Sequence, residues 1–178
     1  ITGSVDMTGS LTVAGSITAT SFTGSQNGST YYMTTAPASV TAGAGTEQSL
    51  ASITIPANAV QVGDRVEIFY SFSKVGANGQ CSFRIKISGS GTDGTLLNNA
   101  ATQGATVLGV NSLLMYRVLS TSSFWGSSQF FGTVATVGTG INYTGSSLTT
   151  SNTFYFNAVR NSTLDTITLN DCYIKIIR

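Results

Sequence analysis

The chain has 178 residues and very little charge: only 8% are Asp, Glu, Lys or Arg, against about 25% in an ordinary soluble domain. Its net charge of +1 excludes nucleic acid and anionic membranes as obvious partners, because both require a dense basic patch. The absence of His excludes Ser-His-Asp and Cys-His catalysis as well as His-ligated metal sites.

Small residues dominate the composition. The sequence contains 27 Thr, 24 Ser and 20 Gly, a mixture that disfavours helices and suits strands and turns. No stretch approaches the roughly 18 apolar residues that span a bilayer, so we expect no membrane insertion. Cys81 and Cys172 form no CxxC pair, so we expect no metal site and no cofactor. The two residues are expected to be either two buried thiols or one disulfide.

The first elements, at residues 1–25, follow a six-residue repeat. Gly-Ser recurs at positions 3, 9 and 15, and each pair is followed by an aliphatic residue, Val5, Leu11 or Ile17. This period is typical of a β-solenoid, but a few rungs cannot bury enough surface in one chain. We therefore expect an intertwined trimeric, β-helix-like stalk with the aliphatic residues inside, and further repeats before Ile1. The alternative is a flexible linker.

Residues 26–46 lose the six-residue period and carry Pro37 with several glycines, which indicates a neck or connector. Its large side chains are Tyr31, Tyr32 and Met33. We expect them to pack the junction between the stalk and the next domain rather than to bind a ligand.

Residues 47–178 predict an all-β head. Short runs of β-branched and aromatic residues alternate with Gly, Asn and Ser clusters. About eight strands in a domain of this size favour a two-sheet, jelly-roll-like β-sandwich. The predicted strands are 50–55, 65–72, 81–87, 105–110, 112–119, 130–137, 153–158, 163–169 and 171–177.

The predicted strands fall into two classes. In 81–87, apolar residues alternate with polar ones, as expected for a strand with one face in water. In 66–72 and 113–119, apolar residues occupy both faces. Because a sandwich strand has only one core face, the second apolar face predicts a subunit interface, consistent with a homotrimer. Cover by a loop of the same chain is the alternative.

The hexad repeats together with residues 47–72, EQSLASITIPANAVQVGDRVEIFYSF, resemble the distal part of a bacteriophage tail fibre or related receptor-binding protein. Ile55-Pro56-Ala57-Asn58 and Val62-Gly63-Asp64 carry the resemblance, where Pro56 ends one strand and Gly63-Asp64 turns into the next. It implies a repeat shaft, a trimeric β-sandwich head, further fibre upstream, and a place in the virion after assembly in the host cytoplasm. The matched motifs are structural, so no binding residue is carried over, and residues 89–164 match no family pattern.

Large aromatic residues embedded in turn-forming sequence are the candidate receptor-binding residues. Phe124 and Trp125 stand between Ser-rich segments, and Asn142 and Tyr143 stand between Gly-rich ones, which predicts exposed loop tips. An aromatic face stacked on a sugar, with Asn supplying hydrogen bonds, suits a neutral glycan. The alternative for Trp125 is a plug in the core or at an interface.

The seven carboxylates give little support to an enzyme. Asp93 lies in a Ser- and Gly-rich turn, and a glycosidase would need two carboxyl groups about 5 to 10 Å apart, which only tertiary structure could supply. We therefore expect host attachment through a bacterial surface glycan or protein, without catalysis. The alternatives are a purely structural module that trimerises and caps the shaft and, third, a polysaccharide hydrolase.

Overall fold

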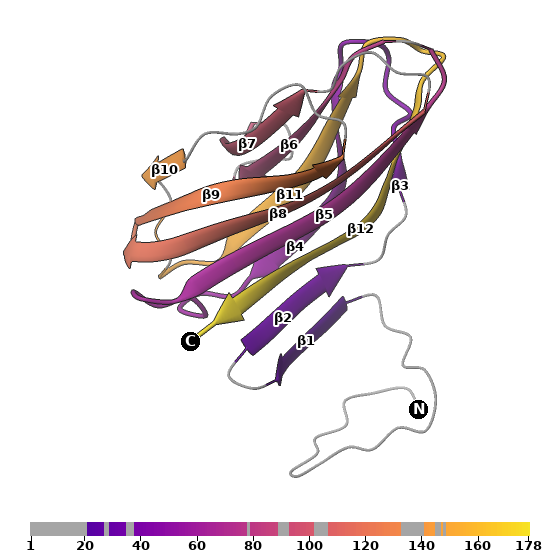
Figure 1. Ribbon diagram of the computed structural model, residues 1–178. Helices are drawn as coiled ribbons and strands as arrows, with labels where there is room; N and C mark the ends of the chain where they lie inside the picture. Colours follow the sequence, from indigo (N-terminus) through magenta and orange to yellow (C-terminus); the bar gives the residue numbers. More distant parts are fainter. Residues whose placement is uncertain are drawn as a thin grey trace, which may run out of the picture.

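The computed structural model of the chain describes residues 21–26, 29–34, 38–77, 79–88, 93–101, 107–132, 141–144, 147 and 149–178. Within them every regular element is a strand, and no helix is long and apolar enough to cross a membrane. The strands form two antiparallel sheets packed face to face as a sandwich (Figure 1). The expected all-β class and two-sheet head are confirmed.

The larger sheet has eight strands in the described part of the chain, in the order β1-β2-β12-β5-β8-β9-β10, with β3 also paired to β12. Their bounds are β1 Ser21–Gln26, β2 Ser29–Thr34, β3 Ala38–Ser39, β5 Arg65–Val75, β8 Val107–Ser120, β9 Ser123–Gly132, β10 Ile141–Thr144 and β12 Thr166–Ile177. The smaller sheet has the order β4-β11-β6-β7. Its strands are β4 Glu47–Ile55, β6 Cys81–Ile87, β7 Thr95–Ala101 and β11 Asn152–Arg160.

The core lies between the two sheets and follows the alternation of the strands. In β6, Cys81, Phe83, Ile85 and Ile87 are at most 1% exposed, as their spacing predicts. Phe83 stacks on Phe72 of β5 in the other sheet, with ring centroids 4.3 Å apart. This contact joins the two layers at the centre of the sandwich.

Two pairs of predicted strands are single long strands in the structure. Segments 105–110 and 112–119 belong to β8, where Asn111 continues the ladder opposite Ser71. Segments 163–169 and 171–177 both fall largely in β12, whose register shifts between Leu169 and Asp171. Asn therefore marks an outward-facing or bulged position in these strands rather than a turn. Strands β2, β3, β7 and β10 were not predicted. Strand β9 overlaps the predicted strand 130–137 only at residues 130–132, and residues 133–137 lie outside the described residues.

Part of the predicted neck is a strand of the sandwich. Strand β2 pairs with β12, and Tyr32 is buried in the hydrophobic core at 6% exposure. At the end of the predicted stalk, β1 pairs with β2. Residues 1–20, with the positions predicted to face the trimer axis, lie outside the described residues.

Candidate functional site

The four candidate receptor-binding residues lie on two neighbouring strands. Phe124 and Trp125 are in β9, and Asn142 and Tyr143 are in β10, where Asn142 pairs with Trp125 and Tyr143 with Phe124. Their placement at loop tips is wrong, because the Ser residues after Trp125 continue the ladder with β8 instead of forming a turn. Only the backbone of these four residues is described. It brings them together at the edge of the larger sheet.

A groove of about 230 Å³ lies at the end of the sandwich where β9 begins. Three connections form it: the segment between β4 and β5, the turn between β8 and β9, and the segment before β11. Figure 1 shows the β8–β9 turn at the same end of the molecule as the C-terminus. The lining residues are Asn58, Val60, Gln61, Val62, Thr121 and Thr149.

One wall of the groove is close in sequence to two of the candidate receptor-binding residues. Thr121 lies in the turn that leads into Phe124 and Trp125. Sequence reasoning missed the groove because its three walls are far apart in the chain. The turn at Gly63-Asp64 was predicted from the sequence, but only as a connection between strands.

A second hollow lies inside the sandwich and is not a binding site. It measures about 10 Å³, room for one water molecule at most, and its lining is almost wholly apolar. It is a packing gap beneath Pro56, surrounded by Ile55, Val60, Val66, Tyr116, Asn152 and Phe154.

The opposite end of the sandwich is closed by a buried ion pair. Lys74, at the end of β5, and Asp165, just before β12, lie 3.0 Å apart with both side chains 0% exposed. Lys74 also donates a hydrogen bond to the carbonyl of Ala77, whereas neither oxygen of the Asp165 carboxylate accepts a hydrogen bond from the residues that the structure describes. The charge of Lys74 therefore compensates the carboxylate.

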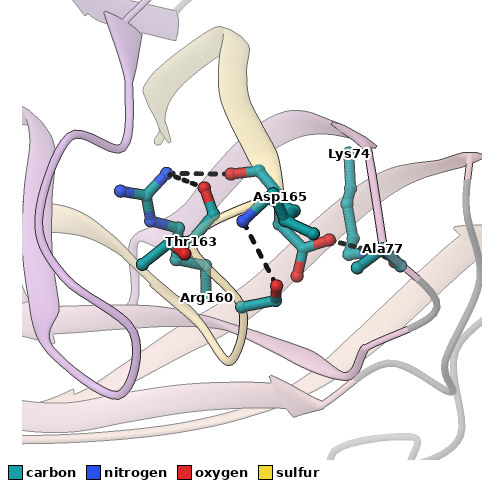
Figure 2. Close-up of polar contacts among 7 residues, drawn as sticks. Lys74, Ala77, Arg160, Thr163 and Asp165 are labelled. Atoms are coloured by element: carbon teal, nitrogen blue, oxygen red, sulfur yellow. Dashed lines mark hydrogen bonds and ion pairs between the residues drawn. The ribbon is translucent and has the colours of Figure 1, made fainter.

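Arg160 connects the neighbouring loops beside the Lys74–Asp165 ion pair. Its guanidinium donates hydrogen bonds to the carbonyls of Ala42 and Asp165, at 2.8 and 2.9 Å. Figure 2 shows Lys74 and Arg160 approaching Asp165 from opposite sides. Gly76 permits the close packing, because at its φ of +138° a side chain is strained and a Cβ would overlap the backbone of Leu164. We call these residues the clamp; its role is structural.

A second charged cluster lies on the outer face of the smaller sheet. Glu47 contacts Arg84 at 2.6 Å and Lys86 at 2.9 Å, and it accepts a hydrogen bond from Asn157. Burial raises the pKa of Glu47, but the hydrogen bonds from Lys86, Arg84 and Asn157 outweigh it and leave the pKa below its ordinary value. The cluster joins β4, β6 and β11 and holds Glu47 ionised.

Other charged side chains also form ion pairs within the fold. Among the described carboxylates, Asp64 and Glu67 also form ion pairs, with Arg178 and Lys175. The described residues contain no group of three His, Cys, Asp or Glu side chains that could hold a metal ion. Cys81 and Cys172 are separate buried thiols, which settles the question that the sequence left open.

A scan against models of known protein families finds no match, and a search of curated proteins finds no similar protein. Among solved structures, the fold matches a chain of the "Structure of infectious bursal disease virus Gx strain" with a TM-score of 0.30 and 13% sequence identity. The alignment covers 84% of this chain and 42% of that one, so the chain spans less than half the length of its match.

Proposed function

We propose that the chain is the tip of a trimeric phage tail fibre and that its head attaches the virion to a bacterial surface receptor, favouring a glycan. The observation that carries this proposal is the open groove with an uncharged lining at one end of the sandwich. The four candidate residues are paired on β9 and β10, and β9 follows the turn that forms one wall of the groove. The hexad repeats and the tail-fibre-like segment 47–72 supply the fibre context.

The strand order supports the jelly-roll form of the head. If β2, β4, β5, β6, β7, β8, β11 and β12 are numbered 1 to 8 along the chain, the larger sheet contains the order 1-8-3-6 and the smaller sheet the order 2-7-4-5. This is the eight-strand arrangement of two Greek keys. Strands β1, β3, β9 and β10 are additions to it, and β9 and β10 carry the candidate residues.

The outer face of the larger sheet is the surface that we assign to the trimer. Tyr173, Phe69 and Leu113 lie directly across β12, β5 and β8, all half-buried, and the rings of Phe69 and Tyr173 stack with centroids 5.1 Å apart. Met115 lies two residues farther along β8 on the same face, opposite Glu67, whose ion pair with Lys175 borders the apolar row. The occupant is a second copy of the chain, because the repeat before β1 needs parallel copies and enters the head at this same sheet.

The trimer is tested by light scattering coupled to size exclusion. The chain should have about three times its mass of 18.4 kDa. Leu113→Arg should abolish that species, because it places three buried charges in the contact. Ser52→Arg, which adds the same charge on the exposed outer face of the smaller sheet, should not. A stable parent monomer at micromolar concentration contradicts the assembly.

Attachment is tested with fluorescently labelled trimer and a panel of bacterial strains. Binding to at least one strain, reduced when surface glycans are stripped, is expected. Binding that survives stripping points to a protein receptor. A correct trimer that binds no strain favours the alternative, a structural module that caps the shaft.

A further inference from the structure

The groove at the open end has walls that are fixed by their own hydrogen bonds. In the β4–β5 segment, the backbone N–H of Gln61 donates to the Asp64 carboxylate at 2.8 Å. The backbone N–H of Gly63 donates to the carbonyl of Val118 in β8 at 3.0 Å. Arg178 adds a hydrogen bond to the Ala59 carbonyl. The wall is therefore organised before any ligand arrives, which reduces the ordering cost of binding.

The other two walls are held in the same way. In the β8–β9 turn, the hydroxyls of Ser120 and Ser123 lie 2.7 Å apart. Before β11, the Asn152 side chain donates to the carbonyls of Ser147 and Thr150. These bonds fix the segments that carry Thr121 and Thr149.

The groove presents neutral polar groups beside apolar ones. None of its lining side chains is charged. Within the described part of the chain, no hydrogen bond occupies the side chains of Asn58, Gln61 or Thr121, so their donors and acceptors are available. Val62 is 59% exposed and supplies an apolar surface.

Two charged side chains of this wall, Asp64 and Arg178, do not line the groove. Asp64 is buried at 6% exposure and accepts a hydrogen bond from the backbone amide of Gln61, while the exposed Arg178 lies 3.9 Å from Asp64 and donates to the Ala59 carbonyl. The groove lining itself therefore offers neutral hydrogen-bonding groups and no charge. A ligand rich in hydroxyl groups can exchange its water for the amide and hydroxyl groups of the groove.

We propose that the groove binds one residue of an uncharged saccharide, with Gln61 and Thr121 as hydrogen-bonding residues and Val62 against the apolar face of the sugar. At about 230 Å³ the groove is smaller than the roughly 300 to 1,000 Å³ of drug-sized ligand sites, so it fits a single sugar residue rather than a long chain segment. This inference rests on the proposed attachment function and names its ligand class.

Saturation-transfer NMR on the assembled protein tests the proposal directly. The probes are glucose, galactose, rhamnose and N-acetylglucosamine, with glucuronic and galacturonic acid as charged counterparts. At least one neutral sugar should bind, and more strongly than the acids. In the double variant Gln61→Leu with Thr121→Val, affinity should fall about tenfold or more, because both residues lose their hydrogen-bonding groups.

Thr166→Val is the matched control, because Thr166 is an exposed Thr at the opposite end of the sandwich and loses the same hydroxyl. It should bind as the parent does. Absence of binding by every neutral sugar, preference for the acids, or undiminished binding by the double variant overturns the inference. Cell attachment of the parent, measured in parallel, separates the two proposals. Attachment without sugar binding overturns saccharide binding in the groove but not the attachment function. Absence of attachment to every strain overturns the attachment function.

Discussion

The two ends of the sandwich use charge in opposite ways. At the clamp end, Lys74 and Asp165 are fully buried as an ion pair, and Arg160 is committed to backbone carbonyls. At the groove end, the lining of the groove is formed by amides, hydroxyls and aliphatic groups, and the exposed Arg178 lies outside that lining. A chain with only 15 charged residues thus places several of them in structural contacts and leaves the groove lining uncharged. On this difference we base the proposal that the clamp end serves stability and the groove end serves contact.

The largest expected effect comes from breaking the clamp. Asp165→Asn removes the charge that compensates the buried Lys74, and we expect a loss of about 3–5 kcal/mol in the free energy of unfolding. Urea denaturation of the assembled protein measures it. The double variant Lys74→Met with Asp165→Leu should recover most of the loss, because no buried charge then remains. A single variant as stable as the parent would show that the pair is not needed at this end.

A smaller effect is expected at Glu47, with a defined pH dependence. Because folding lowers the pKa of Glu47, its contribution to stability is present above the unfolded value of about 4.3 and is lost as the pH falls through the folded value. Glu47→Gln should therefore cost about 1 kcal/mol at pH 7 and progressively less toward pH 3. Asp171→Asn, at an exposed carboxylate, is the control. A pH-independent cost would contradict the ionic role of Glu47.

The candidate residues beside the groove should affect attachment without affecting the fold. Trp125→Ala and Tyr143→Ala are each expected to weaken cell binding, and together they test whether β9 and β10 extend the contact surface of the groove end. Trimer mass and melting temperature serve as controls and should stay nearly unchanged. If either variant fails to assemble, that aromatic residue packs an interface instead.

The smallest effect concerns the thiols of the core. Burial raises the pKa of Cys172 to about 12, so very little thiolate exists at pH 8. A thiol reagent such as DTNB should not react with the folded protein. After denaturation without reductant, both Cys81 and Cys172 should react, because they are thiols rather than a disulfide. A rapidly reacting thiol in the folded state would show that the core opens.

The sequence predicted what depends on local pattern. Strand 81–87 was predicted with its correct bounds, because the strict alternation of apolar and polar residues indicates both a strand and the face that is buried. Pro56 and Gly63 also mark the end of β4 and the turn before β5 correctly, since Pro56 fixes its own φ and Gly63 can adopt the positive φ of 98° found in the turn.

The groove and the clamp depend on contacts between segments that are distant in the sequence, so no local pattern predicts them. Lys74 gave the one available signal: it occupies an inward position in the alternation of 66–74, which requires a buried partner. The identity of that partner, Asp165, follows only from the fold. The aromatic residues were chosen for their Ser- and Gly-rich surroundings, and pairing between β8, β9 and β10 overrides that local preference.

The claim that the groove end contacts the receptor is tested most directly by blocking each end in turn. Thr121→Cys and Thr166→Cys introduce an exposed thiol at the groove end and at the clamp end, while the buried native thiols stay unlabelled. Each variant is coupled to maleimide-polyethylene glycol, and its attachment is measured on a bacterial strain to which the parent protein attaches. Our account predicts that the polymer abolishes attachment at position 121 and leaves it unchanged at position 166; attachment that survives the polymer at position 121 would contradict it.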